Sequence, residues 1–208
     1  MPAPEFNLYL VTDRRQTAGR DLLWVLEQAL AGGIKAIQLR EKDLAGRDLF
    51  LLAEKCRKLC ENYRAALIIN DRIDIALAVD AAGVQLGKLS LPIPTARQLL
   101  GPRKLIGAST HSLEEAQAAE ESGADFMVFG PIYFTPSKAR YGEPQGLIAL
   151  KEIVEKTSLP VYAIGGIKAA SICEAKHTGI RGVALISAVM SASNPKLATE
   201  ELLTILGR

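Results

Sequence analysis

The 208-residue sequence has only three cysteines, and aromatic side chains make up 5% of it. A small, odd number of cysteines gives no disulfide framework of the kind that small secreted domains need. Cys56 and Cys60 lie one helical turn apart, and with His177 they could hold a metal ion. No other Cys or His lies close in sequence to complete such a site, so we expect two buried helix cysteines and place His177 near the end of a helix.

Long apolar runs and an excess of one charge are also missing. No stretch approaches the roughly 20 apolar residues of a membrane span, and the first residues lack the basic start of a signal peptide. The formal net charge is +2, with basic and acidic residues interleaved. These features argue against a membrane or a nucleic acid as the main partner. We expect a cytoplasmic protein that binds small anions, and the sequence leaves open whether it forms a homo-oligomer.

What the sequence does contain is an aliphatic pattern, since 49% of the residues are hydrophobic. Short apolar runs alternate with longer amphipathic segments, as in βαβ units. Strands are expected at residues 8–12, 34–39, 66–70, 83–86, 105–109, 125–130, 161–166 and 182–187. The clearest helical segments are 21–32, 46–63, 112–123 and 195–206, and the weakest is 93–101. Eight such units predict one (β/α)8 TIM barrel over residues 1–208; the alternative, a doubly wound open sheet, usually has fewer strands.

Charged and polar residues follow the expected strands. Arg40, Glu41, Lys42 and Asp43 come directly after the second strand. In a barrel all carboxyl ends of the strands meet at one face, where active sites lie, so we expect this cluster to face a shared site. Other strand ends carry Asp13, Asn70, Asp71, Lys88, Ser90, Ser109, His111, Thr135, Lys138 and Ser187. Cations, hydroxyl groups and glycines together indicate a ligand with anionic oxygens, most simply a phosphate.

Two segments favour phosphate more specifically. "AIGGI" and "ALISAV" end the seventh and eighth strands, whose loops commonly offer backbone N–H groups to phosphate, and Gly165 and Gly166 let a backbone come close. The connection 130–146 has no clear element of its own, which is typical of a lid or binding loop, or else of a surface excursion. Within it, Thr135, Ser137 and Lys138 could bind phosphate.

The strings "QLREK", "INDR", "HSLEEA", "TPSK", "AIGGI" and "LISA" occur in an order that resembles the thiamine phosphate synthase family, which includes the thiazole tautomerases. The resemblance covers nearly the whole chain, from Leu8 to about Pro195. It implies a transferase of thiamine biosynthesis that joins a pyrimidine methyl diphosphate to a thiazole phosphate and releases diphosphate. The implied reaction is dissociative, so neutralising the leaving diphosphate matters more than a protein nucleophile.

The resemblance also implies roles for individual residues. Arg40, Lys42 and Lys138 would neutralise the diphosphate, and Asp71 would bind Mg²⁺. The implied substrate-binding residues are Gln38, Arg40, Lys42, Asn70 and Ser109 for the pyrimidine substrate, with Lys138 closing over it, and Thr135, Ser137, Gly166, Ile186 and Ser187 for the thiazole phosphate. Glu41 has no implied role beyond orienting Arg40 or Lys42.

Two features leave the branch of the family open. His111 is a candidate for proton transfer, although a packing or capping role fits it equally, and it precedes an S-x-x-E capping box at Ser112 and Glu115. Where synthases resembling this chain have a second carboxylate for magnesium, this sequence has Ser90, with Lys88 nearby to supply positive charge. A thiazole tautomerase, which is an isomerase, and a non-catalytic regulator that binds thiazole phosphate therefore remain alternatives to the synthase.

Overall fold

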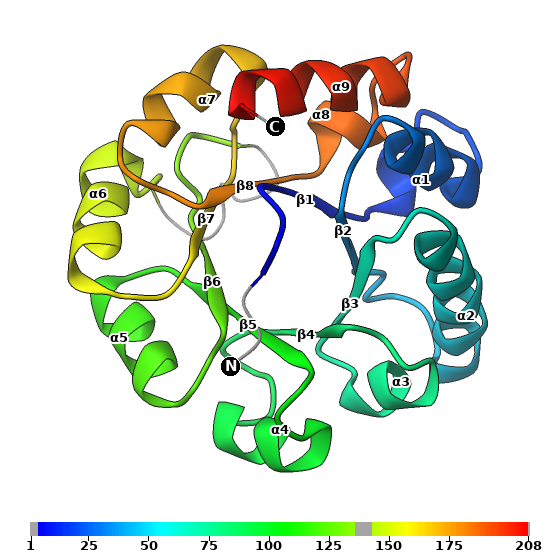
Figure 1. Ribbon diagram of the computed structural model, residues 1–208, viewed down its shortest axis with the longest axis horizontal. Coiled ribbons are helices and arrows are strands. Elements are labelled where there is room, and N and C mark those ends of the chain that lie inside the picture. The colour runs from blue at the N-terminus through cyan, green and yellow to red at the C-terminus, as the bar shows by residue number, and fades with distance from the viewer. Residues whose placement is uncertain (1–3, 136–142, 208) are drawn as a thin grey trace.

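Eight short parallel strands close into a barrel in the computed structural model, which describes residues 4–135 and 143–207 (Figure 1). The strands are β1 (Leu8–Val11), β2 (Ala36–Leu39), β3 (Ala66–Asn70), β4 (Gly83–Leu86), β5 (Leu105–Thr110), β6 (Phe126–Phe129), β7 (Val161–Ile164) and β8 (Gly182–Leu185). Each strand pairs with the next in sequence, and β1 also pairs with β8. The predicted (β/α)8 barrel is confirmed, and the alternative of an open sheet is wrong.

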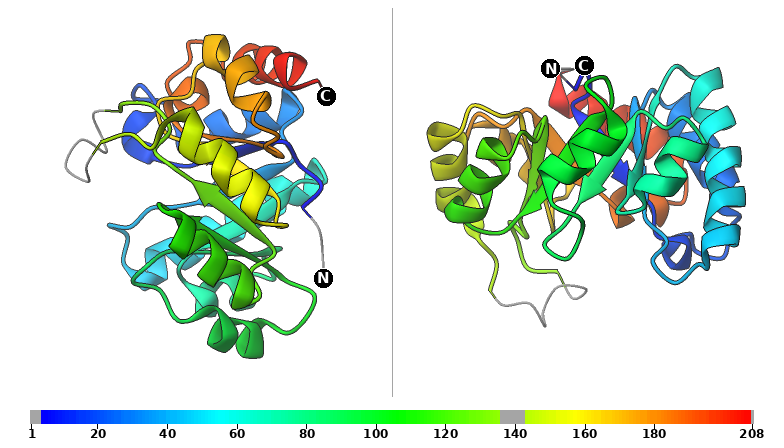
Figure 2. Two further views of the ribbon diagram at one scale, coloured as in Figure 1. Left: turned by 90° about the vertical axis from the view of Figure 1, so that its left-hand side faces the viewer. Right: turned by 90° about the horizontal axis from the view of Figure 1, so that it is seen from below.

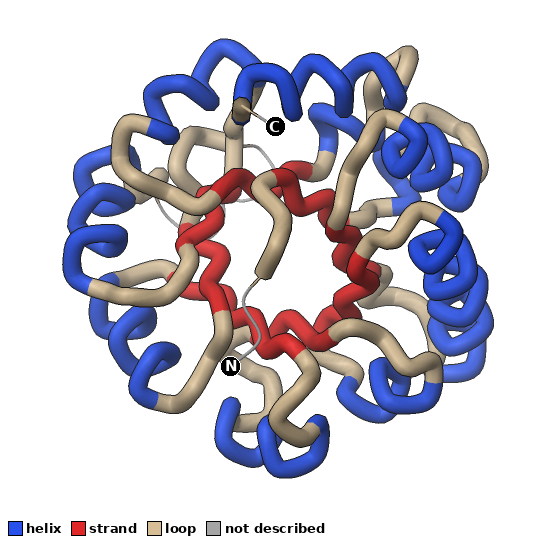
Figure 3. Tube along the Cα trace, in the orientation of Figure 1, coloured by secondary structure: helices blue, strands red, loops and turns tan. Residues whose placement is uncertain are grey.

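The helices form a ring around the strands (Figure 3). They are α1 (Leu22–Ala31), α2 (Gly46–Asn62), α3 (Ile73–Ala78), α4 (Ile93–Leu100), α5 (Leu113–Glu121), α6 (Gly146–Lys156), α7 (Ala169–Lys176), α8 (Ser187–Met190) and α9 (Pro195–Leu206), with a 3-10 turn, η1 (Arg14–Gln16), after β1. Cys56 and Cys60 are buried in α2, and His177 caps the end of α7, as expected. The weakest predicted helix, α4, is present.

Four strands end earlier than the sequence indicates, β1 and β6 by one residue and β7 and β8 by two. β7 stops at Ile164 because Gly165 and Gly166 take φ values of +97° and +65°, which no strand residue adopts. β8 stops at Leu185, and Ser187 begins α8 instead of extending the strand. Because the chain leaves the sheet after Ile164 and Leu185, the next backbone N–H groups lie at the carboxyl face of the barrel and not within the sheet.

Side chains from alternate strand positions fill the barrel, and aromatic rings close its amino end. Phe6, Tyr9, Phe126 and Tyr162 pack with ring centroids 5.0–6.2 Å apart. The Tyr162 hydroxyl donates to the Phe6 carbonyl at 2.7 Å. Figure 3 shows the described segment before β1 extending toward the centre of the ring of strands. The described residues therefore leave the opposite, carboxyl end as the place for a site.

Candidate functional site

The predicted site residues lie at the carboxyl end of the barrel, because all eight strands run parallel. They follow or end five different strands: Gln38, Arg40 and Lys42 at β2; Asn70 and Asp71 at β3; Ser109 and His111 at β5; Gly166 at β7; Ile186 and Ser187 at β8. Thr135 belongs to the β6–α6 connection, whose described ends project from this face in Figure 2 (right). Ser137 and Lys138 lie outside the described residues. The structure thus brings the described candidates to one face, and their roles stay predictions.

The acidic and basic residues after β2 differ in whether they have partners. Asp43 accepts from the Arg14 guanidinium, with Nη1 to Oδ1 at 2.5 Å and Nη2 to Oδ2 at 2.8 Å, and it also pairs with Arg15. These guanidinium contacts lower the pKa of Asp43 to about 2. Among the described residues, neither Arg40 nor Lys42 has an ion pair or a side-chain hydrogen bond. The two cations of the segment are consequently available to an anionic ligand.

Glu41 is buried, with a side chain only 3% exposed, and it binds Arg14. Its carboxylate accepts from the Arg14 backbone N–H at 3.1 Å (Oε1) and from Arg14 Nη1 at 3.1 Å (Oε2). Among the described residues, Glu41 makes no ion pair or side-chain hydrogen bond with Arg40 or Lys42, and an orienting role for it stays a prediction. The neighbouring Arg40 backbone N–H instead donates to the Thr12 hydroxyl at 2.9 Å.

Amide side chains form the floor of the site inside the barrel. Gln38 is buried and its Nε2 donates to the Tyr9 hydroxyl at 3.2 Å. Burial raises the pKa of that Tyr9 hydroxyl, which keeps it neutral. Gln85 Nε2 donates to Ser109 Oγ at 3.1 Å, whereas Gln85 Oε1 is buried with no partner in the described part of the chain. The Ser109 hydroxyl is thus held by a residue from the adjacent strand.

The end of β3 places Asp71 in an uncommon backbone conformation. Its φ is +67°, a left-handed value that Asp tolerates better than most residues, and its N–H donates to the Gln85 carbonyl at 2.9 Å. Asp71 is exposed and directly follows β3. Residues with such backbones persist where the surroundings hold them and are common at binding sites.

The segment after β4 carries no second carboxylate. Ser90 Oγ accepts from the Gly87 N–H at 2.8 Å, which closes the turn. Lys88 Nζ pairs with Glu115 of α5 at 3.6 Å. Within the described residues no group of three His, Cys, Asp or Glu side chains could hold a metal ion. The segment after β4 thus adds no carboxylate to Asp71, and the role of Asp71 as a Mg²⁺ ligand stays a prediction.

His111 is exposed and oriented by backbone contacts. Its Nδ1 lies within hydrogen-bond distance, 2.5 Å, of the Gly130 carbonyl. A carbonyl only accepts, so Nδ1 is the donor in this contact, and a role of His111 in proton transfer stays a prediction. Ser112 caps α5 as predicted, but Glu115 Oε2 accepts from the His111 N–H and not from Ser112.

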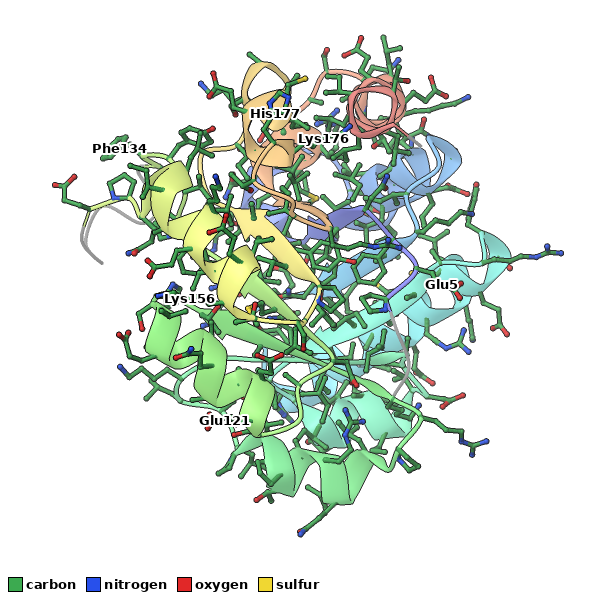
Figure 4. All side chains as sticks on the ribbon, turned by 60° about the vertical axis from the view of Figure 1, so that its left-hand side comes forward. Glu5, Glu121, Phe134, Lys156, Lys176 and His177 are labelled. Carbon is green, nitrogen blue, oxygen red and sulfur yellow. The ribbon has the colours of Figure 1, made fainter. Side chains whose placement is uncertain are left out.

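The ends of β7 and β8 expose backbone donors. In the described ranges, the N–H groups of Gly166, Ser187 and Ala188 donate to no other residue. A Cβ on Gly166 would lie 2.7 Å from the Phe134 carbonyl oxygen and 2.7 Å from Tyr133 Cβ, so glycine is needed for packing as well as for its φ of +65°. Figure 4 shows Phe134 at the edge of the molecule. This residue is 67% exposed.

Comparison with known proteins decides the family. The family model described as "Thiamine monophosphate synthase" matches residues 8–189. The chain belongs to this family. A Geobacter sulfurreducens protein named "Putative thiamine-phosphate synthase" is 52% identical over 99% of this chain and 97% of its own. A "Thiamine-phosphate synthase" of Desulfitobacterium hafniense is 44% identical over 98% of each chain. The solved structure of the "Thiamine phosphate pyrophosphorylase from Pyrococcus furiosus" superposes with a TM-score of 0.88 at 42% identity, covering 97% of this chain and 96% of that one.

Membership of the thiamine monophosphate synthase family confirms the resemblance. The names of these relatives confirm the expected transferase, and they do not favour the thiazole tautomerase or the regulator. No helix in the described residues is long and apolar enough to cross a membrane. A cytoplasmic location and a homo-oligomer stay predictions. Thr12 and Arg14 were not predicted as residues near the site, although both follow the first strand and contact the Arg40 N–H and Glu41.

Proposed function

We propose that this chain catalyses the thiamine-phosphate synthase reaction at the carboxyl end of its barrel. The substrates are two small phosphorylated molecules, a pyrimidine methyl diphosphate and a thiazole phosphate. The observation that supports this most is that cations after β2 and backbone N–H donors after β7 and β8, which have no partner among the described residues, lie on one face. Two separate anion sites on one face suit two phosphorylated substrates that must meet.

Arg40 and Lys42 would receive the diphosphate. As the bond between the pyrimidine methylene carbon and the diphosphate oxygen breaks, the diphosphate leaves with the electron pair. The carbocation that remains accepts the lone pair of the thiazole nitrogen, which completes the new carbon–nitrogen bond. Two guanidinium or ammonium groups already in place at the leaving oxygens stabilise this developing charge without reorganisation. Lys138, which the sequence adds to this group, lies outside the described residues and remains part of the proposal.

The thiazole phosphate would lie across the ends of β7 and β8. Free N–H groups of Gly166, Ser187 and Ala188 are suited to phosphate oxygens, and α8 is the short additional helix that often completes such a site in barrels. Thr135 follows Phe134, whose carbonyl lies close to Gly166, and it would join the Ile186 backbone in this site. On the opposite side, Asn70 and the hydrogen-bonded Ser109 would contact the pyrimidine ring.

Asp71 would hold Mg²⁺ together with the diphosphate of the substrate. A bound Mg²⁺ would add positive charge beside the leaving group. With Ser90 engaged by Gly87 and Lys88 paired to Glu115, the segment after β4 adds no carboxylate to Asp71, and among the described residues Asp71 belongs to no group of three possible ligands. We expect the magnesium requirement to depend on the diphosphate and on Asp71 alone.

The experiment measures product formation from both substrates with Mg²⁺. Arg40→Ala and Lys42→Ala should each reduce turnover by about 10²-fold, because each removes a cation from the leaving diphosphate. Arg103→Ala, which removes an exposed arginine just before β5 at the amino end of the barrel, is the matched control and should leave turnover unchanged. Unchanged turnover in both site variants would overturn the diphosphate assignment.

The thiazole site needs its own variants, because a side chain on Gly166 would displace the Tyr133 and Phe134 backbone whatever binds there. Ser187→Asp keeps a good residue for the first turn of a helix but puts a carboxylate beside the phosphate. It should raise the KM for thiazole phosphate about 10-fold or more. Ser187→Ala should change that KM little, since the backbone N–H is retained. If Ser187→Asp and Ser187→Ala have the same KM for thiazole phosphate, the phosphate binds elsewhere.

A further inference from the structure

We infer that Glu41 is a positioning residue that acts by binding Arg14. This contact keeps negative charge away from Arg40 and Lys42, and it fixes both cations toward the diphosphate. The inference rests on the proposed function, since it assigns Arg40 and Lys42 to that ligand. Glu41 lies between these two residues in sequence and yet is buried, while Lys42 is exposed.

The first support is the way the two strand ends are joined. Thr12 N–H donates to the Gln38 carbonyl at 2.9 Å, and the Thr12 hydroxyl accepts from the Arg40 N–H at 2.9 Å. Thr12 is fully buried. Two residues further on, the Arg14 backbone N–H and guanidinium bind Glu41. We call Thr12, Arg14, Glu41 and Asp43 the brace; it ties the backbone of residues 38–43 to the end of β1.

The second support is the separation of charge. Four charges stand in a row at residues 40–43, and in a flexible turn Glu41 and Asp43 would neutralise Arg40 and Lys42. In the structure Arg14 takes both carboxylates, at 3.1 Å from Glu41 and 2.5 Å from Asp43. In the described parts of the chain, Arg40 and Lys42 are left with no ion pair. The brace therefore makes the site more positive than the alternating charges of residues 40–43 alone would indicate.

Arg14→Ala is the sharpest test, because it frees the Glu41 carboxylate beside the diphosphate site and leaves Asp43 with Arg15 as its only partner among the described residues. The dissociation constant for inorganic diphosphate, measured by calorimetry, should rise about 10-fold. The KM for the pyrimidine substrate should rise in parallel, and the KM for thiazole phosphate should stay within about two-fold. Adding Glu41→Gln to Arg14→Ala should recover at least about three-fold of the diphosphate affinity, since it removes the freed carboxylate. A purely structural role predicts no recovery.

Glu41→Gln alone and Thr12→Val test the geometric half of the inference. In Glu41→Gln, the side chain keeps one oxygen that can accept from Arg14 and loses the other. Thr12→Val removes the hydroxyl that accepts from the Arg40 N–H. Each should raise the KM for the pyrimidine substrate several-fold without changing that for thiazole phosphate. If Glu41→Gln does not fold, Thr12→Val and Arg14→Ala still decide the matter, since the Arg14 side chain is 34% exposed.

Asp125→Asn provides a matched control. Asp125 is also a buried carboxylate that accepts from a guanidinium, Arg97 Nη2 at 2.6 Å, and from a backbone N–H, that of Ile106 at 2.7 Å. It directly precedes β6, at the other end of the barrel. Its variant should lower the melting temperature and leave both KM values unchanged. If Asp125→Asn raises the pyrimidine KM as much as Glu41→Gln does, the effect is general loosening and the inference is wrong.

The outcomes separate this inference from the proposed function. If the parent protein forms no product from the two substrates, the proposed function fails. If the parent is active and Arg40→Ala abolishes turnover, but Arg14→Ala binds diphosphate as tightly as the parent, the positioning role of Glu41 fails alone.

Discussion

Replacing Gly107 by alanine should damage both the stability of the barrel and the pyrimidine side of the site. Gly107 lies in β5, and a Cβ there would be 2.4 Å from Gln85 Oε1 and 2.4 Å from Phe126 Cζ. Phe126 cannot retreat, because it is fully buried among the aromatic rings that close the barrel. Gln85 must therefore move, and its hydrogen bond to Ser109 at 3.1 Å is lost.

The cost has two parts. Overpacking a core by one methyl group costs about 1–3 kcal/mol, and losing a buried neutral hydrogen bond costs about 1 kcal/mol more. A total of about 3 kcal/mol corresponds to a fall in melting temperature of about 6–12 °C in a domain of this size. Because Ser109 loses its donor, the KM for the pyrimidine substrate should also rise several-fold.

Differential scanning calorimetry and steady-state kinetics measure both effects. Gly87→Ala is the matched control: it also adds one methyl group, but the nearest atom would be Ser90 Oγ at 4.0 Å. Its stability should change by less than about 0.5 kcal/mol. If Gly107→Ala melts within about 2 °C of this control and binds the pyrimidine substrate normally, the close contact at Gly107 does not govern the site.

Three further predictions concern the rest of the molecule. The pKa of Asp43 is lowered to about 2 by Arg14, so this pair stabilises the fold above about pH 4, and its contribution is lost as the pH falls toward 2. In Asp43→Asn, the free energy of unfolding measured with urea should therefore depend less on pH between pH 5 and 3 than it does in the parent. An unchanged pH dependence would contradict the pairing. Cys173 alone should react with a thiol reagent in the native protein, because both cysteines of α2 are buried; labelling of a second thiol, read by mass spectrometry, would count against that burial. Tyr162→Phe removes the donor to the Phe6 carbonyl and should cost about 1–2 kcal/mol with no change in turnover; an unaltered melting temperature would mean that this contact is not formed.

The strands of this barrel could be predicted because they are buried on both faces and read as short aliphatic runs. "ALIIN" and "GVQL" match β3 and β4 residue for residue. The ends of β7 and β8 could not be placed in the same way. Gly165 and Ser187 continue the pattern of the preceding strands, and only the backbone shows that one has a φ of +97° and the other begins a helix.

The brace lay beyond sequence reasoning for a different reason. "QLREK" shows that cations and carboxylates alternate, but which of them are neutralised depends on the register between two strands. That register pairs Val11 with Gln38, and it brings Arg14 beside Glu41 from a distance of 27 positions in the sequence. Local propensity carries no information about such a pairing.

The pairing of β1 with β8 also has a consequence for how the chain folds during its synthesis. Leu8 pairs with Val183, and Phe6 accepts a hydrogen bond from a residue 156 positions later. At about 5–20 residues per second, a ribosome needs on the order of 10–30 s to make the intervening chain. Throughout that interval one side of β1 is an open edge that can pair with another nascent chain. Slowing translation between β1 and β8 should therefore increase aggregation of newly made protein while leaving the refolded protein unaffected.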